Sequence, residues 1–371
     1  MSGSRPVLGV LGGGQLGRML AQVAERLDVE TRLYDPNAEA CAGQVASLTS
    51  GAWDDLDAVR RWAEACDVVT YEFENVPEAT ARAVDEVATL RPGLQPLVIA
   101  QDRVRERELF RRLEIPTPKW AKAETAEALE RAARTLPLPA IVKATRGGYD
   151  GKGQMTLASA ADAASVFAEL GSRTVILDER VAFDREVSCV GAFGVDGSAS
   201  IYPLAENVHH EGILVRSTAP AAGLKSGGAV SALRSLATEL GYVGVLAVEF
   251  FDVGGRLLAN EFAPRVHNTG HWTMDGTTLS QFEAHVRAVM GMGLPEITAD
   301  RPTVMANLIG SDAVAGEVES HPALRVHRYG KAARPGRKVG HVNVLIDACG
   351  GGPEEAASLA DRATAGNVYA E

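Results

Sequence analysis

The chain has 371 residues, a formal net charge of −11 and 46% hydrophobic residues, which is enough for two or three domains with ordinary apolar cores. This acidic balance argues against general binding of nucleic acid or of anionic membranes, so an anionic substrate would need a local cluster of Lys and Arg. No apolar run is long enough to span a bilayer, and the first residues lack a signal-peptide core. Four scattered cysteines without metal-ligand spacing are typical of a reducing compartment, so we expect a cytoplasmic protein.

The first hundred residues alternate between strand-like and helix-like segments. The hydrophobic patterns predict strands at residues 6–11, 31–34 and 67–73, a helix at residues 16–24 and a further helix from Pro77. This order predicts a domain built on a parallel sheet.

The turn after the first strand carries the glycine spacing of a dinucleotide-binding fold. Gly12, Gly14 and Gly17 match GxGxxG, and Asp35 lies near the place of a ribose-binding acid. The motif establishes only that backbone approaches a ligand at a helix N-terminus. An NAD enzyme would also need a hydride-transfer site, and no clear His/Asp or Tyr/Lys arrangement for one is present. A nucleotide or phosphate site and a tight structural turn both stay open at this point.

After residue 100 the pattern changes to a charged helix and then to a series of strands. Helices are expected at residues 101–113, which end at the prolines of "IPTP", and near residues 160–170. Strands are expected at residues 140–144, 155–158, 174–177, 186–193, 200–204, 245–252 and 257–262. The residues from about 303 onward read as a small mixed unit.

The most informative stretch is a second glycine loop, "VKATRGGYDGKGQ". Lys143 ends a strand, and the loop then carries four glycines and two cations, at Gly147, Gly148, Gly151, Gly153, Arg146 and Lys152. Such a loop can fold over a polyphosphate, offering backbone N–H groups and positive charge. It is not a P-loop, because GxxxxGK[ST] is absent. The number of glycines and cations favours this interpretation over a hairpin with a solvated lysine.

Two acids lie in neighbouring apolar strands, Glu249 in "LAVEFF" and Glu261 in "LLANEFAPR". A buried acid is costly unless it is paired or bound to a metal. If the two converge, with Asn260 beside one of them, they would form a Mg²⁺ site that bridges ATP phosphates. The strand period also allows each acid to face solvent, so spacing alone leaves both interpretations open.

A polar loop, "APRVHNTGHWTMDG", follows Glu261 directly. It packs five polar side chains into seven residues: Arg265, His267, Asn268, Thr269 and His271. Arg265 can hold a carboxylate or phosphate by two parallel hydrogen bonds, and His267 can orient an anion or move a proton. A polar loop at the end of a metal-binding strand is suited to catalysis.

A basic cluster near the end of the chain indicates a second anion site. It places five cations in eleven residues: Arg328, Lys331, Arg334, Arg337 and Lys338. In a chain this acidic, such a cluster favours a phosphate-bearing substrate over a solvated face.

Six segments follow one another in an order known from one enzyme family: "GGGQLGRML", "YEFENVP", "KATRGGYDGKGQ", "NVHHEGIL", "NEFAPRVHNTGHWT" and "YGKAARPGRKVGH". With them, nearly the whole chain resembles the N5-carboxyaminoimidazole ribonucleotide synthetases, ATP-grasp enzymes of purine synthesis. The resemblance implies a fold of α/β and α+β character. It implies a Rossmann-like pre-ATP-grasp domain at residues 1–100, an ATP-grasp domain at 101–302 with a lid subdomain at about 118–182, and a small C-terminal domain at 303–371.

The family's reaction sets the implied substrates. Members convert 5-aminoimidazole ribonucleotide, bicarbonate and ATP into the N-carboxylated ribonucleotide, ADP and phosphate through carboxyphosphate. The resemblance therefore implies ATP and Mg²⁺, with bicarbonate as co-substrate and no NAD. It also implies a homodimer, coupling to the mutase that uses the labile product, and neither a nucleic-acid nor a membrane partner.

On this sequence the resemblance implies an ATP site between two sheets. The phosphates would contact Arg103 and Lys143, and the lid loop would close over them with Gly148, Tyr149, Asp150, Gly151, Lys152, Gly153 and Gln154. The hinge against adenine would be Asp178, Glu179, Arg180 and Val181, where Asp178 replaces the usual Glu. Glu186 would hold the ribose hydroxyls, with His209 nearby. Glu249 and Glu261 would carry Mg²⁺, with Asn260 beside them.

The resemblance also implies a carboxylation site. Arg265, His267 and Lys331 would position bicarbonate and carboxyphosphate, and Lys338, helped by Arg337, would take the phosphate of the ribonucleotide. The other substrate-binding residues would be Gln15, Glu72, Asn75, Tyr149, Asp150 and Asn268. The first glycine turn would then form the floor of the ribonucleotide pocket, and Asp35 would be a turn residue.

Two kinds of alternative stay open. Another ATP-grasp carboxylase, or a formate-dependent ribonucleotide transformylase, would share the fold and differ in its acceptor. An NAD-dependent oxidoreductase or a non-catalytic nucleotide-binding module would bind its cofactor at the first glycine turn instead.

Overall fold

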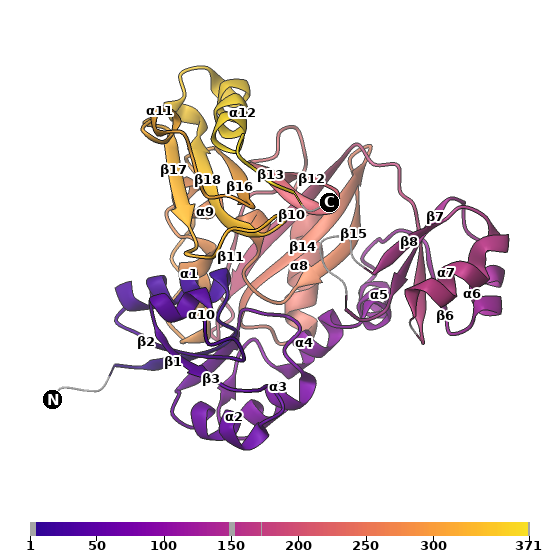
Figure 1. The fold of residues 1–371 in the computed structure, drawn as a ribbon, viewed down its shortest axis with the longest axis horizontal. Helices are drawn as coiled ribbons and strands as arrows, with labels where there is room; N and C mark the ends of the chain where they lie inside the picture. The colour runs from indigo at the N-terminus through magenta and orange to yellow at the C-terminus, as the bar shows by residue number, and fades with distance from the viewer. Residues whose placement is uncertain (1–4, 148–152, 172, 370–371) are drawn as a thin grey trace.

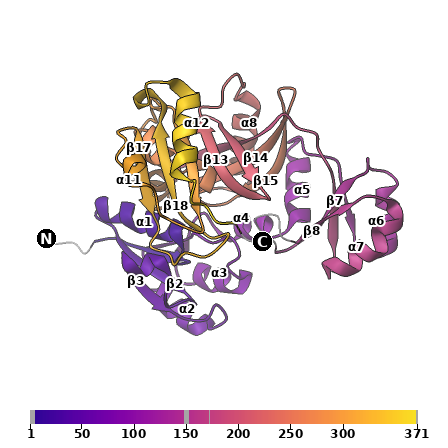
Figure 2. The same cartoon turned by 45° about the horizontal axis from the view of Figure 1, so that its top comes forward.

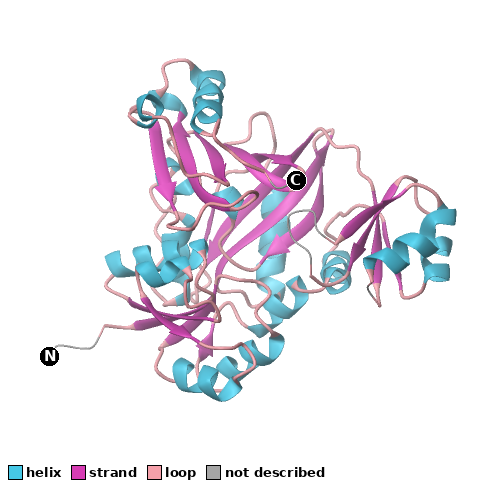
Figure 3. Cartoon of the chain, in the orientation of Figure 1, coloured by secondary structure: helices cyan, strands magenta, loops and turns pink. Residues whose placement is uncertain are grey.

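The computed structural model describes residues 5–147, 153–171 and 173–369. In these ranges the strands form a parallel sheet, a small antiparallel sheet and a large sheet that carries the rest (Figures 1 and 3). No helix in the same ranges combines the length and the apolar character needed to cross a membrane.

The N-terminal sheet is fully parallel, with the order β3-β2-β1-β4-β5. Its strands are β1 (Val7–Leu11), β2 (Glu30–Asp35), β3 (Ser47–Ser50), β4 (Val68–Tyr71) and β5 (Thr89–Leu90). Its helices are α1 (Gln15–Arg26), α2 (Leu56–Ala63), α3 (Glu78–Asp85) and α4 (Leu94–Ala100), with a 3₁₀ turn η1 (Cys41–Gln44). β1 and β4 are buried along almost their whole length, as a parallel strand covered on both faces must be. The predicted parallel α/β domain is confirmed.

The large sheet has the order β15-β14-β10-β12-β13-β16-β18-β17, with β11 added on β10. Its first strands are β10 (Arg185–Phe193), β11 (Ala199–Ile201), β12 (Ala205–His210), β13 (Ile213–Ala219), β14 (Gly244–Val253) and β15 (Arg256–Ala263). The helices of this region are α5 (Arg103–Arg112), α8 (Gly227–Glu239), α9 (Thr273–Gly276) and α10 (Gln281–Val289), after the 3₁₀ turn η3 (Asn268–Gly270).

β14 shows how this sheet forms the floor of a site. Leu246, Val248 and Phe250 point to the core that contains α8, whereas Val245 and Ala247 point to the core that contains α10. The next residue on the α10 side is Glu249. On that face of β14 the apolar core therefore ends at Glu249, and the side chains beyond it are free to form a polar site.

The small sheet, with the order β6-β9-β7-β8, stands to the side of the large one, beyond α5 (Figures 1 and 2). It consists of β6 (Trp120–Ala123), β7 (Ala140–Ala144), β8 (Gln154–Leu157) and β9 (Val175–Glu179), covered by α6 (Ala126–Ala133) and, after the turn η2 (Ala160–Asp162), by α7 (Ala163–Leu170). Its own apolar core makes it a separate packing unit.

The residues expected as a small mixed unit extend the large sheet. β16 (Thr303–Ile309), β17 (Leu324–Arg328) and β18 (Lys338–Leu345) join it through the antiparallel pair β13–β16. Helices α11 (Gly316–Glu319) and α12 (Gly352–Ala363), with a turn η4 (Ile346–Ala348), complete the chain. The basic cluster runs from the last residue of β17 to the first residue of β18, where the charge of Lys338 acts on Glu249 of β14.

Candidate active site

The first glycine turn is filled by carboxylates of the chain itself. At the N-terminus of α1, the backbone N–H groups of Gly14 and Gly17 donate to Glu72, at 2.8 and 3.3 Å. Gly12 has a φ of +108°, and a Cβ there would lie 2.7 Å from the Glu72 side chain. Only glycine therefore lets the turn approach this carboxylate so closely. Burial raises the pKa of Glu72, and the two backbone donors oppose that shift.

Asp35 is the last residue of β2, and its side chain holds the backbone on both sides of that strand end. Its Oδ2 accepts a 2.8 Å hydrogen bond from the backbone N–H of Gly13, and its Oδ1 accepts one of 2.7 Å from Asn37. The helix N-terminus thus receives its anions from within the protein, and the glycine spacing is explained without a dinucleotide.

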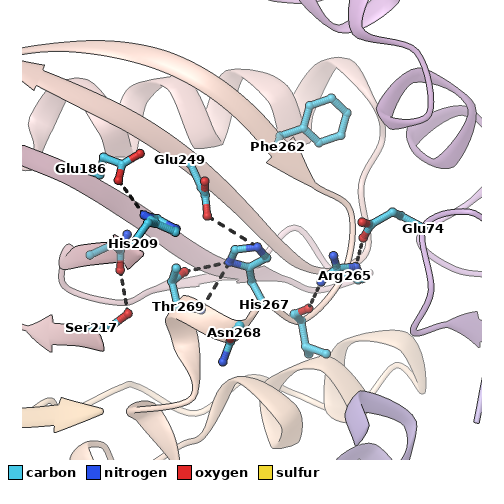
Figure 4. Close-up of polar contacts among 12 residues, drawn as sticks. Glu74, Glu186, His209, Ser217, Glu249, Phe262, Arg265, His267, Asn268 and Thr269 are labelled. Atoms are coloured by element: carbon cyan, nitrogen blue, oxygen red, sulfur yellow. Dashed lines mark hydrogen bonds and ion pairs between the residues drawn. The ribbon is translucent and has the colours of Figure 1, made fainter. Parts of the chain in front are cut away.

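Glu249 and Glu261 converge. They are directly opposite one another in the β14–β15 pair, so both side chains leave the same face of the sheet. Burial, and then the charge of Glu261, raise the pKa of Glu249 to about 7. In Figure 4, Glu186, His209, Glu249 and His267 gather on this face, whereas Phe262 points the other way.

This acid pair fits Mg²⁺ better than a metal held by protein alone. In the described parts of the chain, no group of three or more His, Cys, Asp or Glu side chains is arranged to hold an ion. Mg²⁺ commonly takes one or two carboxylates and completes its shell with phosphate oxygens and water. A cation between the two acids would also relieve the repulsion that raises the pKa of Glu249.

His267 lies next to the acid pair in its uncharged form. Its Nε2 is 3.7 Å from Oε1 of Glu249, and its Nδ1 is 2.9 Å from the Thr269 hydroxyl. Gln281 holds the backbone of His267 on both sides, accepting from its N–H at 2.9 Å and donating to its carbonyl at 2.6 Å. Burial, and then the charge of Arg265, lower the pKa of His267 well below its usual value. The ring is therefore suited to orienting a ligand as a neutral hydrogen-bonding group.

Arg265 is held by a residue of the N-terminal domain that the sequence analysis did not single out. Its Nε is paired with Glu74, in the loop after β4, and its Nη1 donates to the carbonyl of Val266 at 3.0 Å (Figure 4). Gln101 in turn holds the Glu74 loop by donating to the carbonyls of Glu74 and Val76. The only sequence signal for Glu74 was its place beside Glu72 in "YEFENVP".

Lys331 reaches the first glycine turn from the other end of the chain. Its Nζ donates to Oε1 of Gln15 at 2.9 Å. The neighbouring Gly330 accepts a hydrogen bond from Gln44, which also accepts one from Arg18. Burial, and then the nearby Arg337, lower the pKa of Lys331 to about 8. Two residues predicted from distant segments therefore meet.

Glu186 and His209 also meet, on neighbouring strands of the large sheet. Nδ1 of His209 lies 2.6 Å from Oε2 of Glu186. Burial alone would lower the pKa of His209, and the hydrogen bond with Glu186 reverses this, so the net shift is upward. Lys338 begins β18, and its charge acts on both Glu249 and His267.

The predicted ATP side contains a buried ion network. Asp178 accepts from Lys143 at 3.0 Å and from Arg107 at 3.1 Å, and all but a few per cent of its side chain is buried. Burial would raise the pKa of Asp178, but these two cations hold it below its usual value. Arg107 also donates to the backbone of Asn260, so the network joins the small sheet to the strand of Glu261. Arg107 was not predicted, because it appeared as one charge among many in a charged helix.

The other predicted residues are of three kinds: those outside the described residues, those at the two ends of the lid loop, and those elsewhere in the site. Gly148, Tyr149, Asp150, Gly151 and Lys152 lie outside the described residues. Arg103 donates to the carbonyls of Ala144 and Gly147, at the start of the lid loop, and Gly153 and Gln154 lie where the chain enters β8.

The remaining predicted residues of the hinge and the substrate site differ in how far their side chains are exposed to solvent. Asn75 and Arg180 are exposed, and Glu179 and Val181 are partly buried. The Asn268 amide is engaged by Asn307 and His271. Arg337 donates to the carbonyl of Ala332, and Arg328 is drawn away from the basic cluster by a two-pronged pair with Glu319. The contacts of these residues with ligands stay predictions.

Comparison with known proteins accounts for nearly the whole chain. Family models match for the ribonucleotide synthetase preATP-grasp domain at residues 6–101, the ATP-grasp domain at 108–282 and the phosphoribosylaminoimidazole carboxylase C-terminal domain at 303–349. The N5-carboxyaminoimidazole ribonucleotide synthase of Brucella melitensis is 45% identical over 348 residues, covering 90% of this chain and 95% of its own. The chain belongs to the N5-carboxyaminoimidazole ribonucleotide synthase family.

Solved structures agree with this membership. The N5-carboxyaminoimidazole ribonucleotide synthetase of Thermus thermophilus is 42% identical, with a TM-score of 0.91 over 98% of this chain and 99% of its own. A synthase from Aspergillus clavatus, solved with ADP and 5-aminoimidazole ribonucleotide, is 28% identical with a TM-score of 0.87, over 96% and 98% of the two chains. The ATP-grasp fold predicted from the sequence is confirmed, and the protein is an ATP-grasp enzyme.

The raised pKa of Glu249 predicts how stability depends on pH. A carboxyl with a folded pKa near 7 and an unfolded value near 4.3 favours the folded state at low pH, and that contribution is lost as pH rises through 7. Without divalent cation, we expect Glu249→Gln to flatten the fall in thermal midpoint between pH 5 and pH 8 by about 2–4 °C. Glu296→Gln, at an exposed acid, should not change it. Parallel pH profiles for wild type and Glu249→Gln would contradict the assignment.

Proposed function

We propose that this chain uses ATP and bicarbonate to carboxylate 5-aminoimidazole ribonucleotide to N5-carboxyaminoimidazole ribonucleotide, a step of purine synthesis. The observation that carries the proposal is the convergence of two segments typical of the family. Lys338, at the start of β18, lies close enough to the loop after β15 for its charge to lower the pKa of His267, and Lys331 donates to Gln15 beside the first glycine turn. The complex of the Aspergillus clavatus relative with ADP and 5-aminoimidazole ribonucleotide supports the choice of acceptor.

ATP is assigned to the space between the small and large sheets. Lys143 and Arg103 would contact its phosphates, and the loop of residues 148–154 would close over them. The hinge at residues 178–181 would contact adenine, and Glu186, with His209 beside it, would hold the ribose. Because Asp178 already accepts from Lys143 and Arg107, its role at the hinge is to hold Lys143 in place.

Mg²⁺ is assigned to Glu249 and Glu261, with Asn260 nearby. When bound, it neutralises the charge that develops on the phosphates during phosphoryl transfer. Each carboxylate makes it harder for the other to be negatively charged. A divalent cation between them would remove this repulsion, so the pair should bind one strongly.

Carboxylation is assigned to the cations beside this pair. A bicarbonate oxygen attacks the terminal phosphorus of ATP, ADP leaves, and carboxyphosphate forms. Arg265 and Lys331 stabilise the anionic carboxyphosphate, and His267, being neutral, orients it without adding charge. Transfer of the carboxyl carbon to the exocyclic amine of the ribonucleotide then releases phosphate.

The ribonucleotide is assigned to the region between the first glycine turn and the basic cluster. Gln15, Glu72, Asn75, Tyr149, Asp150 and Asn268 would line its base and sugar, and Lys338 and Arg337 would take its phosphate. Glu72 is fixed by the glycine turn, so it can present its carboxylate at one defined position.

Three further features belong to this proposal. We infer that the enzyme works in the cytoplasm as a homodimer and delivers its labile product to a mutase. We describe it as domains at 1–100, 101–302, with the lid at about 118–182, and 303–371. The third domain shares a sheet with the second through β13 and β16.

Lys331→Ala tests the carboxylation site. Because Lys331 would hold anions there and makes its hydrogen bond among the described residues with Gln15, outside the ATP side, we expect product formation to fall by at least about 100-fold while the Kd for ATP changes less than about threefold. Product is measured by chromatography and ATP binding by calorimetry. Wild-type activity should also decline as pH rises through about 8, where Lys331 loses its charge. Normal turnover by Lys331→Ala would overturn its role.

Glu261→Gln tests the metal site. Removing one of two carboxylates should weaken the site for Mg²⁺ and abolish Mg-dependent ATP cleavage, because the phosphates then lose their counter-charge. Cleavage is followed by phosphate release over a series of Mg²⁺ concentrations. Glu206→Gln, at a salt-bridged acid of β12, is the control and should keep wild-type Mg²⁺ dependence. If Glu261→Gln cleaves ATP at the wild-type rate, another group must hold the cation.

A further inference from the structure

Three histidines from distant segments, two of them buried and His327 partly buried, form a stack. His327 on β17 and His341 on β18 have ring centroids 4.5 Å apart with an angle of 14° between planes. His341 and His271 are 4.8 Å apart at 20°, and the ring of Phe282 lies beyond His271, at 5.4 Å and 21°. His271 and His341 are almost wholly inaccessible to solvent. The stack therefore joins the end of the catalytic loop to two strands of the C-terminal region.

Polar contacts fix the orientation of each ring. The Tyr329 hydroxyl lies 2.8 Å from Nδ1 of His341, and the amide nitrogen of Asn268 lies 2.6 Å from Nδ1 of His271. Nε2 of His327 lies 2.7 Å from Asp275, which also accepts from Asn343 at 2.7 Å. The residues that make these contacts lie in the loop after β15, in α9, directly after β17 and in β18. Hydrogen bonds therefore hold the stack both to the loop of Arg265 and His267 and to the C-terminal strands.

The stack does not have the form of a metal site. Nearly parallel rings direct their nitrogen lone pairs in parallel planes, so those of His271 and His341 do not converge on one point. The Nε2 atoms of these two rings are buried and have no hydrogen-bond partner among the described residues. Burial, and then the charge of His327, lower the pKa of His271 to about 3, so this ring is neutral near pH 7. A neutral, tightly stacked unit acts through its shape and its hydrogen bonds.

The position of the stack connects it to both halves of the proposed site. His271 ends the short loop that carries Arg265 and His267. On the other side, Tyr329 lies two residues before Lys331, and His341 lies three residues after Lys338. Since His327 directly precedes Arg328, two members of the stack, His327 and His341, flank the basic cluster before and after it. Among the described residues, the loop of Lys331 is also held by two hydrogen bonds, from Lys331 to Gln15 and from Gln44 to the carbonyl of Gly330.

We propose that His271, His327, His341 and Tyr329 form a positioning unit that fixes Lys331 and Lys338 against Arg265 and His267, and so couples ATP cleavage to carboxyl transfer. The inference rests on the proposed function. Cleavage of ATP needs the groups of the ATP-grasp side and Arg265, whereas keeping carboxyphosphate in place until transfer needs Lys331, and binding the ribonucleotide needs Lys338. Loosening the unit should therefore let activated carboxylate decay to phosphate and bicarbonate before transfer.

Tyr329→Phe is the most direct test, because it removes one hydroxyl and leaves the ring. Nδ1 of the buried His341 then lacks its hydrogen-bond partner. The resulting loss of free energy should shift the loop that carries Lys331. We expect the phosphate released per product formed to rise at least about threefold and the KM for 5-aminoimidazole ribonucleotide about 10-fold, with the Kd for ATP unchanged. Phosphate and product are measured in the same reaction.

Two further variants separate positioning from general stability. Tyr202→Phe removes another buried hydroxyl, which donates to the carbonyl of Leu279, and should lower the thermal midpoint without changing the ratio of phosphate to product. Tyr329→Phe combined with His341→Phe removes both partners while keeping both rings, so it should recover part of the lost coupling, because no buried nitrogen is left unpaired at that contact.

The outcomes are distinct. An unchanged ratio and KM in Tyr329→Phe, or an equal change in Tyr202→Phe, would overturn the positioning role. If the wild type itself forms no carboxylated ribonucleotide, the proposed function fails and the inference falls with it. A raised ratio confined to Tyr329→Phe and relieved in the double variant supports the unit.

Discussion

Three cations of the site are each held by an oxygen from another part of the chain, and the shape of the site depends on these pairs. Arg265 is held by Glu74, Lys331 by Gln15 and Lys143 by Asp178. Buried charges are expensive unless paired, so each pair both stabilises its cation and fixes where it points. Because the first two pairs join the N-terminal domain to later parts of the chain, the site exists only when the domains are docked.

The same constraint explains the first glycine turn. A helix N-terminus with free N–H groups attracts an anion, and in many folds that anion is a bound phosphate. Here Glu72 and Asp35 supply it. Glycines are therefore needed at these positions because the Glu72 carboxylate lies so close to the backbone. The turn in this way fixes the position of Glu72, next to Gln15.

Sequence patterns were most informative where a local rule sets the structure. The alternation of the first hundred residues predicted the parallel sheet. The apolar surroundings of Glu249 and Glu261 left a pair and two solvent-facing acids both open, and only the family resemblance favoured the pair. The strands β12, β13 and β16 to β18 were not predicted individually. For β16 the physical reason is that "TVMANLI" is buried throughout and so shows no alternation. The sharing of one sheet by the last two domains could not be predicted either, because strand pairing between residues about ninety positions apart leaves no local signal.

Partners of site residues were the hardest to predict. Glu74, Arg107 and Asp275 matter only through what they contact across the fold, and in the sequence they look like ordinary surface charges. The histidines of the stack are similar: His271 was noted for its loop, while His327 and His341 gain meaning only from their contact with it.

Phosphate release from ATP, measured with and without 5-aminoimidazole ribonucleotide and bicarbonate, tests the central claim most directly. The account predicts that release with Mg-ATP is stimulated by the ribonucleotide and bicarbonate together, with formation of the N5-carboxylated product. Stimulation by biotin, or by formate with glycinamide ribonucleotide, would contradict it, as would binding of NAD without affinity for Mg-ATP.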